Sequence, residues 1–261
     1  MLGISAGAAS EAGGRHGANE DRVLAGRSVF AVADGMGGHA AGEVASALAV
    51  ARLGLLDAEP VLTPDGFRAQ LAEANADILA SASREPDHRG MGATVAGIGI
   101  ARVAGTEHWV VFNVGDCRVY RWAKGRLTQL TLDHNEAAEV AQAAVTFRDA
   151  AVGVGRRSLV TRSLGSEPAS EPDIRVLPTV PGERFLICSD GLCLELPDSV
   201  IAETLNAEPD AAAAARALVR AAIAAGGRDD VSAVVVDHRI VAAGTTGEDT
   251  QPRHIGTEAL R

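Results

Sequence analysis

Hydrophobic and polar residues alternate along much of the chain, and this alternation predicts a series of β-strands. The expected strands cover residues 28–34, 93–103, 107–115, 117–122, 126–131, 174–177, 184–190 and 230–237. In the segment WAKGRL, Gly125 stands between two of these strands, where a tight turn needs a residue of low steric demand. The pattern therefore indicates a β-hairpin at this point.

Four longer segments have a helical pattern instead, and they cover residues 40–56, 63–84, 197–206 and 209–225. In the second of these, Thr63 is expected as the N-cap and Pro64 as the first helical residue. Residues 135–158 begin with a helical pattern and then become rich in glycine and arginine, so we expect an irregular lobe there.

The order of these elements is a strand, two helices, a run of hairpin strands, further strands, two helices and a last strand. This order favours an α+β fold of antiparallel sheets covered by helices over a doubly wound parallel sheet. Few large apolar residues follow Val241. We expect residues 1–240 to form one domain and residues 241–261 to form a disordered tail.

Composition narrows the range of partners and of cellular locations. Of the 261 residues, 47% are hydrophobic but only 3% are aromatic, so alanine, valine and leucine must fill the core. The net charge of −10 argues against binding to nucleic acid or to an anionic membrane, but not against metal cations. The three cysteines have no disulfide or zinc spacing, which suggests reduced, buried thiols in a cytoplasmic protein. Neither a signal peptide nor a membrane-spanning run is evident.

Four aspartates stand where an apolar run meets a turn that contains glycine: Asp34, Asp116, Asp190 and Asp229. If these ends converge, the carboxylates form a cluster, and two unit charges about 4 Å apart repel by about 4 kcal/mol at an effective dielectric of about 20. Such a cluster needs cations, and carboxylate oxygens suit Mg²⁺ or Mn²⁺. The alternative is that each aspartate is an ordinary turn residue or helix N-cap, which is a weaker explanation for four together.

The segment DGMGGHAAGE follows the first of these aspartates. Gly35, Gly37 and Gly38 would let the backbone turn sharply and would let the carbonyl of Gly35 approach a cation. The segment NED places Glu20 shortly before the same strand, where its carboxylate would accept a hydrogen bond from water bound to a second ion.

Eight segments then identify a family that this chain resembles, the metal-dependent protein serine/threonine phosphatases of type 2C, in their short bacterial form. The segments run in the family's order over residues 15–236: RHGANEDR, VADGMGGHAAGEVAS, GMGAT, NVGDCRVY, LTLDHN, VTRSLG, LICSDGL and GGRDDVSAVVV. The resemblance implies a four-layer αββα sandwich, in which helix pairs flank two antiparallel β-sheets and metals lie in a cleft at one end.

The resemblance also implies the metal ligands. Asp34 would bridge two tightly bound Mg²⁺ or Mn²⁺ ions, and Asp190 and Asp229 would be the other ligands of the first ion. Glu20 and the Gly35 carbonyl would lie around the second ion.

Asp116 would serve a third, weaker ion, and Arg15 would bind the phosphate. Arg15 stands five residues before Glu20, and many bacterial members have this arginine one residue nearer. Either the segment bulges at Gly17 so that Arg15 still reaches the phosphate, or His16 takes part of the role.

The implied reaction is the hydrolysis of phosphoserine and phosphothreonine in proteins by a metal-activated water at a binuclear centre, without a phosphoenzyme. The absence of an evident Ser-His-Asp set or of a C-x₅-R loop agrees with this reaction. Phosphorylated proteins would be the substrates, and a cognate bacterial serine/threonine kinase would be the partner.

The chain departs from the family's usual pattern at four positions, one of which is Ala93 in GMGAT, where threonine is usual. Cys117 replaces a serine, Asp230 replaces an asparagine, and Met36 stands where eukaryotic members have a histidine. The general acid is therefore unassigned, and His134 is not expected to be catalytic. Two other functions remain open: a catalytically weak binding module with the same fold, and a nucleotide-binding protein, whose phosphate loop would need a lysine that this glycine segment lacks.

Overall fold

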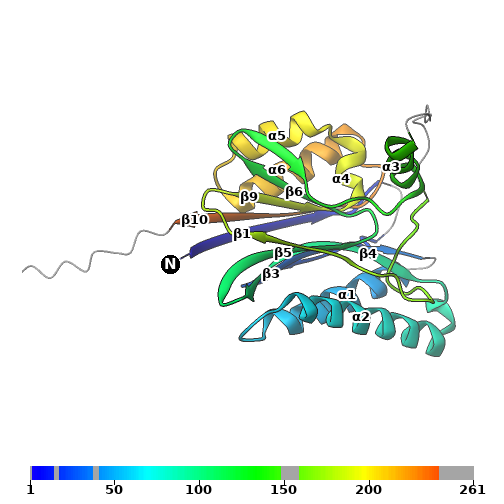
Figure 1. Cartoon of the computed structure of the whole chain (residues 1–261). Coiled ribbons are helices and arrows are strands. Elements are labelled where there is room, and N and C mark those ends of the chain that lie inside the picture. The colour runs from blue at the N-terminus through cyan, green and yellow to red at the C-terminus, as the bar shows by residue number, and fades with distance from the viewer. Residues whose placement is uncertain (1, 15–17, 38–40, 148–158, 241–261) are drawn as a thin grey trace, which may run out of the picture.

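The computed structural model describes residues 2–14, 18–37, 41–147 and 159–240, and within them two five-stranded β-sheets pack face to face (Figure 1). The first sheet has the order β1 (Leu2–Glu11), β10 (Val231–Ile240), β9 (Arg184–Cys188), β6 (Arg118–Ala123) and β7 (Arg126–Gln129). The second has the order β2 (Arg22–Ala25), β3 (Val29–Met36), β4 (Gly92–Val103), β5 (Thr106–Val114) and β8 (Asp173–Pro178). Every paired strand is antiparallel to its neighbour.

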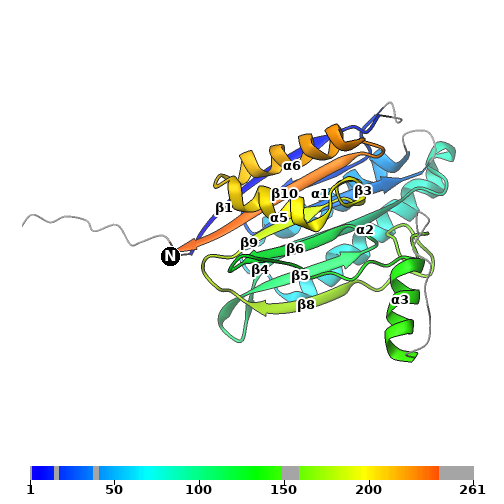
Figure 2. The ribbon, with the colours of Figure 1, turned by 90° about the horizontal axis from the view of Figure 1, so that it is seen from above.

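Helices cover the outer face of each sheet, so that the molecule has four layers (Figures 1 and 2). The second sheet is covered by α1 (Ala41–Asp57) and α2 (Pro64–Arg84), with a short 3₁₀ turn, Pro86–His88, after them. The first sheet is covered by α4 (Asp190–Glu195), α5 (Asp198–Ala207) and α6 (Ala211–Ala225). A further helix, α3 (Glu136–Phe147), stands at one end. The α+β, four-layer αββα fold is thus confirmed, with the short α4 added to one helix pair.

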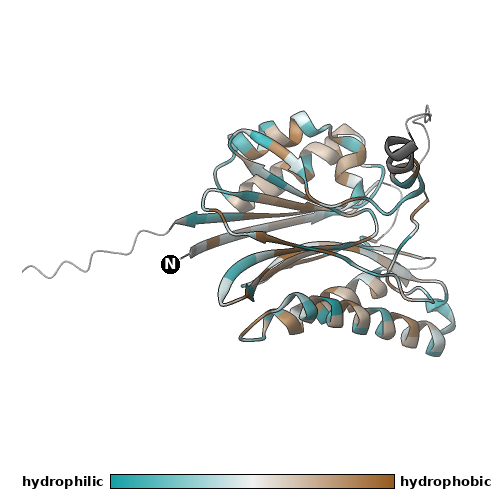
Figure 3. Ribbon diagram, in the orientation of Figure 1, coloured by the Kyte–Doolittle hydropathy of each residue, from teal (hydrophilic) through white to brown (hydrophobic). Residues whose placement is uncertain are grey.

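Three apolar cores separate the four layers, one under each helix layer and one between the sheets. Strand β3 shows how one sequence serves two of them. Its residues Val29, Ala31 and Ala33 face the helices, whereas Phe30 and Val32 face the opposite sheet. Both faces of this strand are buried, and Figure 3 shows hydrophobic residues concentrated in the strands of both sheets. A sheet covered on both sides needs apolar residues at successive positions, which explains the continuous run VFAVA.

The eight predicted strands and four predicted helices are all present, with ends displaced by a few residues. The hairpin at WAKGRL is confirmed, because Ala123 pairs with Arg126 and both Lys124 and Gly125 have positive φ, as a two-residue turn of type I′ requires. Thr63 caps α2 by accepting a hydrogen bond from the Gly66 N–H at 3.2 Å. The helical start of residues 135–158 is α3; residues 148–158 and the expected tail, 241–261, lie outside the described residues.

One predicted strand is too long at its end. The pattern suggested a strand over 184–190, but β9 ends at Cys188 and Asp190 is the first residue of α4. Ser189 is the N-cap, with the extended backbone that lets a strand pass directly into a helix. Asp190 is therefore carried by a helix start and not by a strand end.

Strands β1 and β2 were not predicted. Strand β1 has the sequence LGISAGAASE, whose small residues show no clear alternation of apolar and polar positions. A Cβ atom at Gly7 would lie 2.2 Å from the Cα of Ala212, so this strand lies directly against the backbone of α6. Close approach to an alanine-rich helix therefore accounts for the small residues. Among the described helices, none is long and apolar enough to cross a membrane.

Candidate active site

A cavity of about 490 Å³ lies where the end of β3, the turn after β5, the start of α4 and the segment before β10 meet. Its walls contain five acidic side chains that the sequence singled out and the Gly35 backbone. The lining residues are Glu20, Asp34, Gly35, Met36, Gly37, Thr94, Asp116, Leu159, Val160, Asp190, Asp229 and Asp230. The structure thus brings together segments that are up to about two hundred residues apart. Arg15, the expected phosphate-binding residue, and its neighbour His16 lie outside the described residues.

Gly35 is needed because the start of α1 packs against it. A Cβ at Gly35 would lie 2.1 Å from the carbonyl oxygen of Gly42 and 2.7 Å from that of Glu20. A Cβ at Gly42 would in turn lie 2.5 Å from Oε2 of Glu20. Of the glycines expected to permit a sharp turn, Gly37 has a φ of +155°, whereas Gly35 lies within β3 and does not have positive φ. Its role is to let a strand, a helix and the Glu20 segment approach one another closely.

The backbone of Glu20 is held from both sides of the sandwich. Its N–H donates to Oδ2 of Asp230 at 2.7 Å, and its carbonyl accepts from the hydroxyl of Ser46 in α1 at 2.5 Å. The other oxygen of Asp230 accepts the N–H of Gly13 at 2.8 Å. The aspartate at position 230 therefore has a role that sequence reasoning missed. Each of its two oxygens accepts a different backbone N–H, whereas an asparagine would turn a donor NH₂ group toward one of them.

Asp116 lies in the turn between β5 and β6 and is buried, with 8% of its surface exposed. The preceding residue, Gly115, has φ of +107°, and a Cβ there would lie 2.3 Å from the Cβ of Thr94, so only glycine fits. His134 holds this turn: its backbone N–H donates to the Gly115 carbonyl at 2.9 Å, and its Nδ1 accepts the Gly115 N–H at 3.1 Å. His134 thus positions the turn before Asp116.

The cavity is electrostatically costly for a protein without bound cations. The pKa of Asp34 is raised well above its usual value, first by burial and then by the negative charges of Asp21, Asp190, Asp116 and Asp229. Burial also raises the pKa of Asp116 to about 7, with the charges of Asp190 and Asp133 adding to the effect. These shifts mean that the fold brings carboxylates together against their mutual repulsion.

Asp21 is a further acid that sequence reasoning did not single out. It is 2% exposed, and its Oδ2 accepts the hydroxyl of Ser189, the N-cap of α4, at 2.7 Å. Its Oδ1 is buried without a hydrogen-bond partner in the described part of the chain. Burial, supported by the charges of Asp230 and Asp190, raises the pKa of Asp21 to about 7. The only sequence signal for it was its place in NED, directly after Glu20.

Cys117 is buried, as expected for a small apolar side chain, and its Sγ lies 3.1 Å from the Thr94 hydroxyl. The other two thiols are also free, although Cys193, unlike Cys188, is partly exposed. Met36 does line the cavity, so a thioether lies there and not a group that transfers protons.

The oxygen atoms of this cavity fit a hard divalent cation. Among its described lining residues there is no lysine, arginine or histidine, and six carboxylates stand beside backbone oxygens. Within the ranges that the structure describes, no three His, Cys, Asp or Glu side chains form a group that would hold an ion by themselves. Water molecules and backbone oxygens would therefore complete the coordination, as is usual for Mg²⁺. The donor chemistry and the burial of Asp21 and Asp34 support the fit.

Comparison with known proteins agrees with this arrangement. The model of the family described as protein phosphatase 2C matches residues 15–231. The serine/threonine protein phosphatase PstP of Mycobacterium tuberculosis is 36% identical over 247 residues, which cover 89% of this chain but 46% of PstP. This chain thus spans about half the length of that relative. The serine/threonine phosphatase stp of Listeria welshimeri is 32% identical over 224 residues, covering 83% of this chain and 86% of stp.

Solved structures show the same fold. The catalytic domain of PstP, crystallised in complex with two manganese ions, superimposes with a TM-score of 0.81 and 36% identity. The match covers 92% of this chain and 100% of that domain. A family model that matches most of the chain and two relatives above 30% identity lead to one conclusion. The chain belongs to the protein phosphatase 2C family.

Proposed function

We propose that this protein is a metal-dependent protein serine/threonine phosphatase that hydrolyses phosphoserine and phosphothreonine. The observation that carries the proposal is the convergence of Glu20, Asp34, Asp116, Asp190 and Asp229 in one cavity whose described walls hold no cationic side chain. A catalytic site of this composition binds substrate phosphate only when cations compensate its charge. The names of the family members that this chain resembles support the same reaction.

Asp34, Asp190 and Asp229 would hold one Mg²⁺ or Mn²⁺ ion. A second ion would lie between Asp34 and the Gly35 carbonyl, with Glu20 nearby. A third, more weakly bound ion would be held by Asp116. When bound, such ions supply Lewis acidity and lower the pKa of water, so that no side-chain nucleophile is required. The two manganese ions of the PstP catalytic domain support a binuclear centre.

The chain's own residues would keep these ligands in place. Asp230 and Ser46 hold the backbone of Glu20, so its carboxylate projects from a segment fixed at both its N–H and its carbonyl. Ser189, the residue directly before Asp190, donates a hydrogen bond to Asp21. This bond connects the start of α4 to the NED segment. Leu159, which is 68% exposed, and Val160 form an apolar part of the wall, where the hydrocarbon part of a substrate peptide would pack.

Arg15 would bind the phosphate oxygens of the substrate. Its planar guanidinium donates two parallel hydrogen bonds and stays charged at every working pH, whereas a histidine at position 16 would titrate near pH 6.5. The general acid that protonates the leaving serine or threonine alkoxide stays unassigned, because Met36 cannot transfer a proton.

Phosphorylated proteins are the proposed substrates, and a cognate serine/threonine kinase is the proposed partner that this phosphatase would oppose. We place the reaction in the cytoplasm, since three free cysteines suit a reducing compartment. The net charge of −10 makes nucleic acid and anionic membranes poor partners.

A catalytically weak binding module is the alternative, but such a module has no need for repelling acids in the cavity, and every proposed acidic ligand is present. The test is phosphate release from a phosphothreonine peptide by the purified chain, with Mn²⁺, with Mg²⁺ and with excess chelator. We expect release with either metal and none with chelator. Peptide binding without phosphate release in all three conditions would favour the binding module instead.

A further inference from the structure

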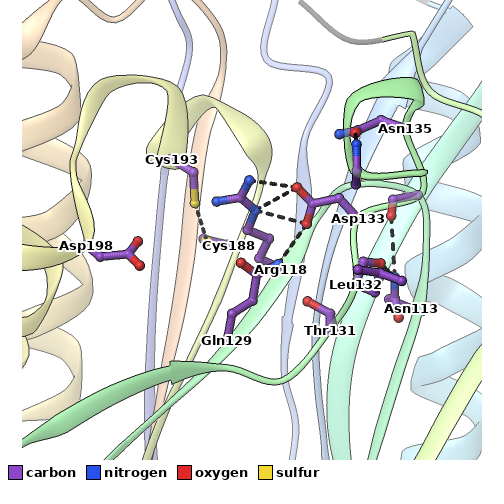
Figure 4. A network of polar contacts seen from close by, with 12 residues as sticks. Asn113, Arg118, Gln129, Thr131, Leu132, Asp133, Asn135, Cys188, Cys193 and Asp198 are labelled. Carbon is purple, nitrogen blue, oxygen red and sulfur yellow. Dashed lines mark hydrogen bonds and ion pairs between the residues drawn. The ribbon is translucent and has the colours of Figure 1, made fainter. Parts of the chain in front are cut away.

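Two of the three cysteines lie side by side in the apolar core beneath α4, α5 and α6. The Sγ atoms of Cys188 and Cys193 are 3.6 Å apart, and Figure 4 shows them facing each other beside the guanidinium of Arg118. Cys188 is the last residue of β9, and Cys193 is the fourth residue of α4. The contact thus spans the junction at which the strand becomes the helix.

The two cysteine residues differ in exposure. Cys188 is fully buried, whereas Cys193 is partly exposed. The surroundings of Cys193 are polar: its Sγ lies 3.5 Å from the hydroxyl of Tyr120, which accepts a hydrogen bond from Arg118 at 2.9 Å. The hydrogen bond from Cys188, together with the positive charge of Arg118, lowers the pKa of the Cys193 thiol. A partly exposed cysteine whose sulfur touches a second thiol is the arrangement of a site that oxidises to a disulfide.

We propose that Cys188 and Cys193 are a redox modification site, at which hydrogen peroxide forms an intramolecular disulfide across the strand-to-helix junction. The thiolate of Cys193 attacks one peroxide oxygen, the O–O bond breaks, and hydroxide leaves and takes up a proton to become water. The sulfur of Cys188 then attacks the resulting sulfenic acid, the S–S bond forms, and a second water leaves with the thiol proton. Peroxide is reduced by two electrons, and the two sulfurs together lose two.

The bridge would act on the cavity because of what lies between the two cysteines. The sulfurs must approach from 3.6 Å to about 2.05 Å, which draws the first turn of α4 toward the end of β9. Ser189, which donates to Asp21, and Asp190, which lines the cavity, are both within this short loop. Displacement of a site residue by about 1 Å can cost up to about a hundredfold in rate. Oxidation would therefore lower activity, a consequence that rests on the proposed phosphatase function.

The third cysteine provides an internal control. Cys117 is buried and its Sγ contacts Thr94, so peroxide should leave it reduced while the other two pair. Cys193→Ser removes the accessible partner with little change of volume and keeps the other two thiols. Cys117→Ser keeps the pair and removes the control thiol.

The experiment treats the full chain with hydrogen peroxide, blocks the remaining thiols with N-ethylmaleimide under denaturing conditions, and measures the intact mass. We expect one maleimide adduct and the loss of two hydrogen atoms in the wild-type protein, and the full number of adducts in Cys193→Ser. Cys117→Ser should lose both of its thiols to the bridge. Full labelling of the oxidised wild-type chain, or a stable oxygen adduct on Cys193 without a bridge, would overturn the site.

Activity is read separately on the same samples. We expect the bridged protein to lose about tenfold in phosphate release, to regain it with dithiothreitol, and to be protected by Cys193→Ser. A bridge without loss of activity would overturn the regulatory consequence but not the site. No phosphate release before oxidation would refute the proposed function, and the mass measurement would still decide whether the disulfide forms.

Discussion

The carboxylate of Asp230 accepts the backbone N–H of Glu20 at 2.7 Å, across 210 positions of sequence. The same carboxylate accepts the N–H of Gly13 at 2.8 Å, and Asp230 is only 6% exposed. One side chain at the start of β10 therefore fixes the loop that carries a proposed metal-binding acid. In this way the last strand of the domain determines the position of a residue near its N-terminus.

Asp230→Ala leaves these two N–H groups without an acceptor, so we expect the free energy of unfolding to fall by about 2 kcal/mol or more. Asp230→Asn keeps one acceptor oxygen but turns an NH₂ group toward the other N–H, so its loss should be smaller than that of the alanine variant. Urea denaturation of the wild type and the two variants measures their free energies of unfolding and so their order of stability. Equal stability of the alanine variant and the wild type would show that neither hydrogen bond contributes to folding.

Asp34→Asn should remove nearly all turnover and leave the domain folded. A neutral amide of the same size cannot bridge two dications, which is the proposed role of Asp34. The pKa of Asp34 is raised by burial and by neighbouring carboxylates, so the amide relieves a cost in the metal-free protein. In chelator, the Tm of the variant should equal or exceed that of the wild type. Near-normal Mn²⁺-dependent hydrolysis of an aryl phosphate by the variant would refute the bridging role.

Arg15→Ala should lower kcat/KM for a phosphopeptide at least about tenfold, or about 1.4 kcal/mol, because the phosphate would lose the bidentate donor that we propose for it. His16→Ala is the matched control and should have a much smaller effect. Kinetics of both variants at about pH 6 and about pH 8 separate the two residues, since only histidine titrates in this range. A larger and pH-dependent defect in the His16 variant would transfer the phosphate-binding role to histidine.

Sequence patterns could predict the elements whose own residues carry the signal, such as a run of apolar residues or a helix cap. Strand β3 is a continuous apolar run because both of its faces are buried. The start of α2 is marked by the N-cap Thr63 and by Pro64, its first helical residue. Strand β1 escaped prediction because its small residues reflect contact with α6, more than two hundred residues away. The six-residue α4 is too short to show a helical period after an apolar strand.

The residues of the candidate site also fall into two groups, those with a signal in the sequence and those without one. Asp34, Asp116, Asp190 and Asp229 could be found from sequence because each follows or precedes an apolar run beside a glycine. The residues that hold them could not, since Asp21 depends on Ser189 and Glu20 depends on Asp230 and Ser46 only in the folded chain. The packing role of Gly35 could not be found either, because its tight contact with Gly42 has no local signature in the sequence.

Arg184 is expected to be among the most important residues for stability outside the cavity. Its guanidinium binds Asp237 through two hydrogen bonds, of 2.6 and 2.9 Å. It also donates to the carbonyl of Leu205 in the last turn of α5 and to that of Pro209 in the connection to α6. Among the described residues, Arg184→Met leaves the buried carboxylate of Asp237 with one exposed partner, Arg239. We expect a loss of about 3 kcal/mol in the free energy of unfolding.

Arg239→Ala is the matched control for this pair, because its side chain is 58% exposed and it binds the same carboxylate. Its cost should stay below about 1 kcal/mol. The two variants are compared by urea denaturation. A cost for Arg239→Ala as large as that for Arg184→Met would mean that the buried geometry of the Arg184 pair adds nothing.

His134 makes the stability of the domain depend on pH in a direction that the structure determines. The pKa of His134 is lowered from 6.5, first by burial and then by the positive charge of Arg162. The neutral ring is the form whose Nδ1 accepts the Gly115 N–H. Below about pH 6.5 the unfolded chain therefore takes up a proton that the folded chain refuses, and this contribution to stability is lost as the pH falls.

His134→Asn replaces Nδ1 by an amide oxygen that accepts the same hydrogen bond and does not titrate in this range. The cavity carboxylates, whose raised pKa values act in the opposite direction, are common to both proteins, so the difference between them isolates the histidine. Relative to the variant, the wild type should lose Tm as the pH falls from about 7.5 to about 5.5 in chelator. Parallel Tm curves over this range would show that folding does not change the pKa of His134, and the pH dependence argued here would then be refuted.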